Sequence, residues 1–296
     1  MKSFTVVICT YNRHHLIESC LKSILSNLIL PKKIIIIDQN YDFLTYKKIT
    51  NIFQSKNYKN YLIKRNLIHK SLTKSKNMSL KYINTKYVFF IDDDLILKKN
   101  YFFENIKLIF RKRGQGVSGV ISNYENNTFK DSFYYIFNFN IFKDNRYYFK
   151  NYRTLKKKFS HLKVFQLPGG MTCFENKIFK QLSFDEKFII HNYEDVEFNI
   201  RLRSRYNNLK LLINFKTEAK DCLKKSLKEN ILMRFYYLRL IYLRNRNFRL
   251  FFFYHLSFFG LIFSNIFNFK VNDYLKIYKK LKNADKKNQL FTSKNY

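Results

Sequence analysis

The stretch 87-YVFFIDDDLIL-97 sets three consecutive aspartates directly after a short apolar run. The run, 87–91, has the length and composition of a strand that is buried on both faces. Asp92, Asp93 and Asp94 would then lie at the carboxyl end of the strand, which is where parallel α/β sheets bind ligands. Three carboxylates this close together repel one another unless a cation lies between them. The stretch therefore predicts a buried strand that ends at a candidate cation site.

Segments of the same kind precede this strand. Strands are predicted at 4–9, 34–38 and 61–65, and they alternate with predicted helices at 15–25, 46–55 and 71–83. Continuous apolar strands separated by helices indicate a mostly parallel sheet that is covered by helices on both faces. Polar groups follow the first two strands, as Thr10-Tyr11-Asn12-Arg13 and Asp38-Gln39-Asn40. We therefore expect three strand ends to place polar side chains at one edge of the sheet.

The remainder of the chain divides into two regions. Residues 98–217 are mixed in character, with a predicted helix at 101–113, strands at 116–122 and 167–174, and a further helix that begins near 192–195. Segment 123–165 has no clean period and fits an insertion, a substrate lid or low-complexity surface. From 218 to 296 the chain is basic and aromatic and is predicted to be helical. We expect one α/β domain over 1–217 and a separate C-terminal region.

The charge balance of the chain is extreme. Its 296 residues include 56 Lys and Arg but only 21 Asp and Glu, which gives a formal net charge of +35. Such a chain favours phosphates or an anionic lipid surface as partners, although part of the charge fits an AT-rich coding sequence. No zinc-finger spacing, arginine-rich tract or RNP-like pattern is present, so we expect no nucleic-acid partner.

The C-terminal region contains an apolar run, Leu250–Phe269, with the length of a membrane span. Polar residues interrupt it, and Arg249 and Lys270 flank it. We interpret it as an amphipathic or shallowly inserted helix that rests on anionic lipid; a helix packed on the domain and a true span are the alternatives. Four widely spaced cysteines and an N-terminus without a long apolar stretch favour the cytoplasm. We therefore expect a cytoplasmic, peripheral protein at the inner face of the plasma membrane.

Two acidic clusters carry candidate chemistry. Asp92 and Asp94 are two residues apart, and Mg²⁺ or Mn²⁺ held by such carboxylates often completes its shell with substrate phosphates. The alternative is a solvated acidic loop, or acids that favour the start of the helix at 101–113. Glu194 and Asp195 lie near the start of another predicted helix. Acids at that position either stabilise the helix or supply a general base.

The order of the motifs along the chain is more specific than any single motif. Residues 4–247 resemble the family-2 glycosyltransferases, which have the GT-A fold. The motifs that carry the resemblance are Thr10-Tyr11-Asn12-Arg13, Asp38, Ser75-Lys76-Asn77-Met78-Ser79, Asp92-Asp93-Asp94, Gly169-Gly170, Phe184-Asp185-Glu186, Glu194-Asp195 and Arg244-Asn245-Arg246. The resemblance implies a GT-A catalytic domain, with 1–97 as its nucleotide-binding half and 98–217 as its acceptor-side half.

The resemblance also implies a reaction, the transfer of a sugar from a nucleotide-diphosphate sugar to a hydroxyl with inversion at the anomeric carbon. Asp195 would deprotonate the acceptor hydroxyl, and Glu194 would hold an acceptor hydroxyl or position the loop. Asp94 would ligate Mn²⁺ or Mg²⁺, and Asp92 would bind the ribose or the metal shell. The remaining implied contacts are Thr10, Tyr11, Arg13, Asp38, Lys76, Asn77 and Asp93 for the nucleotide sugar, and Gly169 and Gly170 on the acceptor side.

Three positions depart from the family pattern. A single Asp followed by Gln39-Asn40 stands where the family has a second acid, which bears on the ribose contacts. The A-R-N-x-G segment has Lys for Arg and Ser for Gly. The metal-binding His of many members is missing from 217–226. Asp221 or His191 could replace it, or Asp94 and the diphosphate could hold the metal alone.

Two other function classes stay open at this level. A metal-dependent nucleotidyltransferase also uses clustered acids, but it normally has a glycine-rich loop after the first strand, where CTYNRHH (9–15) has no glycine. A non-catalytic basic adaptor on a membrane surface would explain the charge but not acids at three successive sites. We therefore expect a glycosyltransferase that acts on a glycan or lipid-linked acceptor in bacterial surface polysaccharide or lipopolysaccharide biosynthesis.

Overall fold

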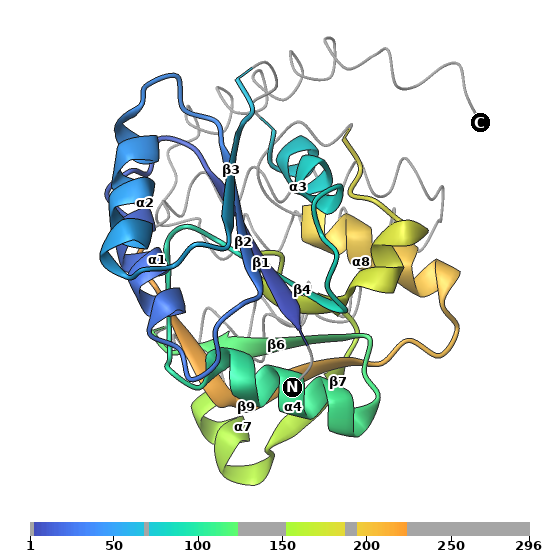
Figure 1. The fold of residues 1–296 in the computed structure, drawn as a ribbon. Coiled ribbons are helices and arrows are strands. Elements are labelled where there is room, and N and C mark those ends of the chain that lie inside the picture. The colour runs from blue at the N-terminus through green and yellow to red at the C-terminus, as the bar shows by residue number, and fades with distance from the viewer. Residues whose placement is uncertain (1–2, 68–70, 124–151, 187–193, 224–296) are drawn as a thin grey trace, which may run out of the picture. The chain divides into compact units, whose positions relative to one another are not determined.

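One nine-stranded sheet organises the residues that the structure describes, and helices lie on both of its faces (Figure 1). The computed structural model describes residues 3–67, 71–123, 152–186 and 194–223 of the chain. All of them belong to one compact unit, which consists of Met1–Asn126 and Lys143–Lys224. The strand order is β3-β2-β1-β4-β8-β6-β9-β5, and β7 pairs with β9. The sheet therefore joins the first strand of the chain to the last one described.

The first half of the sheet is parallel, as the apolar pattern predicts. Its strands are β1 (Phe4–Thr10), β2 (Lys33–Asp38), β3 (Tyr61–Arg65) and β4 (Tyr87–Ile91). β1 pairs in parallel with β2 and β4, and β2 pairs in parallel with β3. The register aligns Thr10 with Asp38 and Asp38 with Arg65. Three polar residues therefore end neighbouring strands at the same edge.

Three helices connect these strands. They are α1 (Ile17–Leu25), α2 (Leu44–Ser55) and α3 (Leu72–Leu80). Figure 1 shows α1 and α2 on one side of the sheet and α3 on the other. The hydroxyl of Ser71 caps the start of α3 by accepting a hydrogen bond from the backbone nitrogen of Lys74 at 3.5 Å. The cap therefore fixes the residue at which α3 begins.

The second half of the sheet is mixed, which corrects the expectation of a mostly parallel sheet. Its strands are β5 (Leu95–Leu97), β6 (Gly116–Ile121), β7 (His161–Val164), β8 (Met171–Glu175) and β9 (Leu211–Asp221). β6 runs parallel to β9, but β8 is antiparallel to β4 and β6, and β9 is antiparallel to β5 and β7. β8 enters the sheet at the carboxyl end of β4, where Met171 pairs with Ile91, and therefore runs in the opposite direction.

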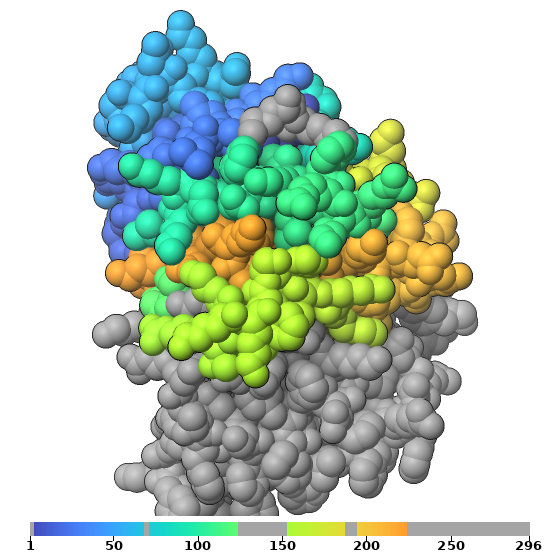
Figure 2. Space-filling view, turned by 90° about the horizontal axis from the view of Figure 1, so that it is seen from below, coloured from blue at the N-terminus to red at the C-terminus, as the bar shows by residue number. Residues whose placement is uncertain are grey.

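The helices of this half are α4 (Tyr101–Lys112), α7 (Tyr152–Lys158) and α8 (Glu194–Arg205), with a 3₁₀ helix at Asn176–Lys180. In Figure 2 the yellow-green residues of α7 and β7 lie against the orange strand β9, next to the green residues of α4. The sequence patterns did not predict α7, β5, β7 or β9. These elements close the sheet on the side away from β3.

The core surrounds β4, which is buried along its whole length. The ring of Phe89 lies 5.3 Å from that of Phe4 and 4.9 Å from that of Phe102, between ring centroids. Tyr101 is buried nearby, and its hydroxyl donates to the carbonyl of Met171 at the start of β8. Apolar packing and this buried hydrogen bond thus hold the ends of β4 and β8 beside each other.

Several expectations concern residues outside the described ranges. β9 continues to Asp221, past the expected domain boundary at residue 217. Residues 224–296 lie outside the described ranges and include most of the C-terminal region with its apolar run, so both stay predictions. Among the described residues, no helix is both long enough and apolar enough to cross a membrane.

Candidate active site

The three aspartates after β4 form a largely buried acidic loop. Asp93 is 1% exposed and Asp94 is 4% exposed. Arg13, from the turn after β1, donates from Nη1 to Oδ1 of Asp93 at 2.9 Å and to Oδ2 of Asp94 at 3.1 Å. Burial and the charge of Asp92 raise the pKa of Asp94 to about 7, against the opposing effect of Arg13. The loop therefore concentrates negative charge that one arginine only partly neutralises.

A second polar group lies at the ends of β1, β2 and β3. Asp38 is fully buried, and its Oδ1 accepts from the backbone nitrogen of Asn40 at 3.0 Å and from Nδ2 of Asn40 at 2.7 Å. Its Oδ2 has no hydrogen-bond partner among the described residues. Burial raises the pKa of Asp38, although the bonds from Asn40 and the charge of Arg65 oppose this. One carboxylate oxygen is thus left to accept a donor from a ligand.

Arg65 was not predicted as a site residue. Its Nη2 donates to the carbonyls of Asn40 and Tyr41 at 2.7 Å each, so it fixes the segment after β2. Its guanidinium also lies over the ring of Phe43, 4.4 Å from the centroid. The signal was present in the sequence, because Arg65 ends a predicted strand in the same way as Asp38 does.

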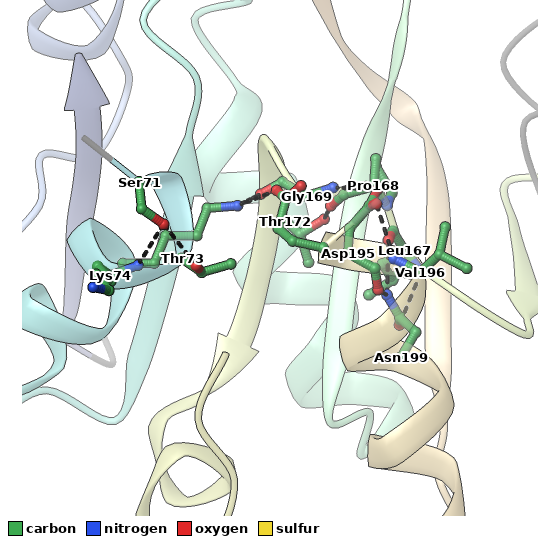
Figure 3. A network of polar contacts seen from close by, with 12 residues as sticks. Ser71, Thr73, Lys74, Leu167, Pro168, Gly169, Thr172, Asp195, Val196 and Asn199 are labelled. Carbon is green, nitrogen blue, oxygen red and sulfur yellow. Dashed lines mark hydrogen bonds and ion pairs between the residues drawn. The ribbon is translucent and has the colours of Figure 1, made fainter. Parts of the chain in front are cut away.

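The Gly169-Gly170 turn lies between the acidic loop and helix α8, and Figure 3 shows Gly169 beside Asp195 of that helix. The backbone nitrogen of Asp92 donates to the carbonyl of Gly170 at 2.6 Å. On the other side, the backbone nitrogen of Gly169 donates to Oδ2 of Asp195 at 3.0 Å. A methyl group at Gly170 would lie 1.8 Å from Oδ2 of Asp92, so a larger residue there would force the Asp92 side chain to move. The turn therefore contacts an acid of each cluster.

Helix α8 is fixed against the segment that leads into this turn. Asn199 accepts from the backbone nitrogen of Leu167 at 3.1 Å and donates to the carbonyl of Leu167 at 3.0 Å. Oδ1 of Asp195 accepts from the backbone nitrogen of Val196 at 2.8 Å, within the first turn of the helix. Figure 3 shows these residues on the side of the turn opposite α3. The position of the Asp195 carboxylate is thus set by backbone groups of two segments.

Lys76 reaches the same turn from α3. Its Nζ lies 2.9 Å from Oε1 of Glu194 and donates to the carbonyl of Gly169 at 3.3 Å. Burial acts to lower the pKa of Lys76, but the charges of Glu194 and Asp92 outweigh it and raise the pKa above its usual range. Lys76 and Glu194 therefore form a charged pair that is enclosed by protein.

The other predicted site residues fall into two places. Thr10 is buried at the end of β1 in register with Asp38, and Tyr11 begins the turn that follows. Asn77 instead faces the acceptor-side segment: its Nδ2 donates to the carbonyl of Phe184 at 2.8 Å, and its Oδ1 accepts from the backbone nitrogen of Phe184 at 2.9 Å. Asn77 thus ties α3 to the motif that begins at Phe184.

The acidic loop offers the oxygen ligands that Mg²⁺ and Mn²⁺ prefer. Burial and the crowding of like charges raise the pKa of Asp94, and a cation would relieve the crowding. Asp221 lies alongside, since it pairs with Leu95, and its charge also raises the pKa of Asp94. Within the described ranges, no three or more His, Cys, Asp or Glu side chains form a set that could hold a metal by themselves. The residues therefore fit a metal that shares its shell with substrate phosphates; His191 lies outside the described residues.

The sequence matches the family model described as Glycosyl transferase family 2 over residues 5–183, which is more than half of the chain. The chain therefore belongs to glycosyl transferase family 2, a family of glycosyltransferases. No curated protein matches the sequence.

Solved structures share the fold. A mannosyltransferase from Pyrobaculum calidifontis in complex with GDP-Man and Mn²⁺ has a TM-score of 0.62 at 11% identity, over 96% of this chain and 80% of that one. GalNAc-T7 with UDP, GalNAc and Mn²⁺ has a TM-score of 0.57 at 13% identity. S. aureus TarS 1-349 in complex with UDP-GlcNAc has a TM-score of 0.54 at 14% identity.

The GalNAc-T7 match covers 76% of this chain but only 44% of the GalNAc-T7 chain. The TarS match covers 80% of this chain and 66% of the TarS chain. At such low identities the likeness shows the fold, which is that of the GT-A glycosyltransferases.

Proposed function

We propose that the chain transfers a sugar from a nucleotide-diphosphate sugar to a hydroxyl of a glycan or lipid-linked acceptor, with inversion at the anomeric carbon. One observation carries the proposal. The Gly169-Gly170 turn contacts Asp92 of the acidic loop on one side and Asp195 of α8 on the other. A group transfer needs donor and acceptor groups held together in this way, because proximity replaces a bimolecular encounter.

The nucleoside would bind at the ends of β1 and β2. Oδ2 of Asp38 is an acceptor for a ring N–H of the base, and Thr10 and Tyr11 flank it at the end of β1. Arg13 supplies positive charge beside the acidic loop, where the diphosphate would lie. Asp94 and Asp92 would hold Mn²⁺ or Mg²⁺, which stabilises the negative charge of a diphosphate leaving group when bound.

The acceptor would bind on the other side of the turn. We assign the role of general base to Asp195, whose two oxygens are held by the backbone nitrogens of Gly169 and Val196. Each carboxylate oxygen can accept more than one hydrogen bond, so the acceptor hydroxyl can still approach. A base fixed on two segments keeps its alignment with the sugar while the proton moves.

Replacement of Asp195 tests the base. Asp195→Asn keeps the shape of the side chain, but its amide can accept only one of the two backbone hydrogen bonds and cannot take up a proton. Release of nucleotide from a panel of nucleotide sugars with Mn²⁺ should fall by about 10²- to 10⁴-fold. Calorimetric binding of the released nucleotide should stay at the wild-type level. Near-wild-type turnover would show that another group is the base.

Replacement of Asp94 tests the donor side separately. Asp94→Ala removes an oxygen ligand but leaves Asp195 and its contacts intact. Calorimetry with Mn²⁺ should show loss of the metal-dependent part of nucleotide affinity, while metal-free binding is retained. Equal Mn²⁺-dependent affinity in the variant and the wild type would remove Asp94 from the metal site.

We further propose that the acceptor is built on a lipid carrier or a lipopolysaccharide-type core at the inner face of a bacterial plasma membrane. The net charge of +35 and the basic, aromatic sequence of 218–296 support this setting. The donor screen described above would identify the sugar and the nucleotide.

A further inference from the structure

We propose that Lys76 is a positioning residue, whose ion pair with Glu194 fixes the Gly169-Gly170 turn so that Asp195 stays aligned with the acidic loop. The inference rests on the proposed function for its catalytic consequence. It assigns Lys76 to the junction of the two halves of the site and makes Glu194 its partner.

The pair is enclosed on all sides. The side chains of Lys76 and Glu194 are 3% and 7% exposed, and Nζ and Oε1 lie 2.9 Å apart. The ammonium group also lies 5.1 Å from the ring centroid of Phe184 and 5.9 Å from that of Phe90. Aromatic faces attract a cation and keep water away from it. A lysine held in this manner has a single arrangement, which is what a positioning group requires.

Lys76 acts on the backbone of the turn as well as on Glu194. Its Nζ donates to the carbonyl of Gly169 at 3.3 Å, and the nitrogen of the same residue donates to Asp195 at 3.0 Å. Gly169 is therefore held on its two backbone groups by α3 and by α8. A movement of Lys76 would therefore shift Gly169 and change the hydrogen bond from the Gly169 nitrogen to Asp195.

Stability alone is a weak explanation for this pair. Burial of two charges costs free energy that their attraction often does not recover, and apolar replacements are frequently as stable. A direct contact between Lys76 and a substrate phosphate is a different reading, and it would require the ammonium to leave Glu194 and Gly169. The two readings predict opposite kinetic effects, since a phosphate ligand acts on donor binding and a positioning group acts on turnover.

The test compares four variants of the full chain. Lys76→Met and Glu194→Gln each remove one charge, the double variant removes both, and Lys76→Arg keeps the charge and the donor. Lys74→Met is the control, because Lys74 lies on the same helix and points away from the turn in Figure 3. The double variant leaves no unpaired buried charge, so it keeps the comparison valid if a single variant fails to fold.

Hydrogen exchange measured by mass spectrometry reads the position of the turn without any substrate. Amides of 167–172 should exchange faster in Lys76→Met and in the double variant, and at the wild-type rate in Lys76→Arg and Lys74→Met. Unchanged exchange in a folded Lys76→Met or, where that variant does not fold, in the double variant overturns the proposal.

Kinetics of nucleotide release from UDP-GlcNAc and GDP-mannose, with Mn²⁺, give the second readout. Lys76→Met should lower kcat about 100-fold with KM for the donor unchanged, and Lys76→Arg should restore most of it. A raised KM with unchanged kcat would make Lys76 a donor ligand and overturn the positioning role. If the wild type releases no nucleotide from any nucleotide sugar, the proposed function fails, and the exchange experiment still decides the role of Lys76.

Discussion

At the scale of single residues, the site depends on close contacts that a larger side chain would displace. Gly170 shows this best, because its carbonyl accepts from the backbone of Asp92 while its Cα faces the Asp92 carboxylate. The glycine has a negative φ, so it is required by space and not by backbone conformation. The identity of residue 170 thus fixes where the Asp92 carboxylate can lie.

Gly170→Ala should displace Asp92 and weaken Mn²⁺-dependent nucleotide binding by at least about tenfold, which is about 1.4 kcal/mol. Isothermal titration calorimetry would measure the affinity, and circular dichroism would verify the fold. Gly114→Ala is a matched control, because the nearest atom to its new methyl group is Cδ1 of Leu212 at 3.1 Å, the end of a flexible side chain. Wild-type affinity in a folded Gly170→Ala protein would contradict the steric argument.

The strand ends at which Asp38 and Asp92 stand were predictable from the sequence, but the hydrogen-bond partners of the site residues were not. Asp38 and Asp92 were placed because each follows an apolar run, and a strand end is a local signal. The contact between Lys76 and Glu194 joins residues 118 positions apart, and no local pattern encodes it. Asn77 was expected at the nucleotide sugar for its motif alone, whereas its side chain bonds to Phe184. Partners of this kind depend on how α3 and α8 meet across the turn.

At the scale of elements, helix α4 holds together the antiparallel strands β6 and β8. The hydroxyl of Tyr101 donates to the carbonyl of Met171 on β8 and accepts from the backbone nitrogen of Gly119 on β6 at 3.2 Å. A methyl group at Gly119 would lie 2.7 Å from the Tyr101 ring, so helix and strand are in close contact. The hydroxyl of Tyr101 therefore links α4, β6 and β8 near the start of β8.

Tyr101→Phe should lower the free energy of unfolding by about 1–3 kcal/mol, because it leaves the buried Gly119 N–H without its acceptor. Met171 keeps a second donor, the hydroxyl of Ser118 at 3.1 Å, so most of the loss comes from Gly119. Urea denaturation should show a lower midpoint with an unchanged slope. Tyr46→Phe, at a position 39% exposed, should leave the midpoint unchanged. A loss equal in both variants would argue against the bridging role.

Apart from the short strand β5, the elements before residue 122 were predictable because apolar runs and helical periods there are clean. The predicted strand at 61–65 coincides with β3, and the one at 87–91 coincides with β4. β9 was missed because LLINFKTEAKD (211–221) passes from an apolar run into charged residues, which hides its strand character. The direction of β8 was missed for another reason. Whether a strand pairs in parallel or antiparallel depends on tertiary contacts and not on composition.

At the scale of the whole molecule, charge is the dominant property. The net charge is +35, and the described residues show where part of it collects. Arg111 and Lys112 at the end of α4, with Lys216 on β9, lie close enough to His161 for their charges to help burial lower its pKa. Lys157 and Lys158 on α7, which packs against β9, are also exposed. A basic surface of this kind attracts anionic partners over about 10 Å at moderate salt.

The full chain should therefore co-sediment with vesicles that contain phosphatidylglycerol and not with vesicles of phosphatidylcholine alone. Raising the ionic strength from about 0.1 M to about 1 M shortens the Debye length from about 10 Å to about 3 Å and should release much of the bound protein. Equal sedimentation with both vesicle types would place the attraction in apolar contacts, and absence of binding would remove the main support for a membrane-bound acceptor.

The pairing of β5 with β9 has a mechanical consequence. Leu95 pairs with Asp221, and the backbone nitrogen of Cys222 donates to the carbonyl of Asp94 at 2.9 Å. A chain cut at residue 217 would lose all of the backbone pairing between β9 and β5. The acidic loop would also lose its hydrogen bond from Cys222. A force that pulls on the chain after residue 223 would likewise act first on the hydrogen bond between Cys222 and Asp94. Residues 218–222 thus hold the acidic loop in place, so they are needed for the proposed donor site even though none of them is assigned to bind the nucleotide sugar.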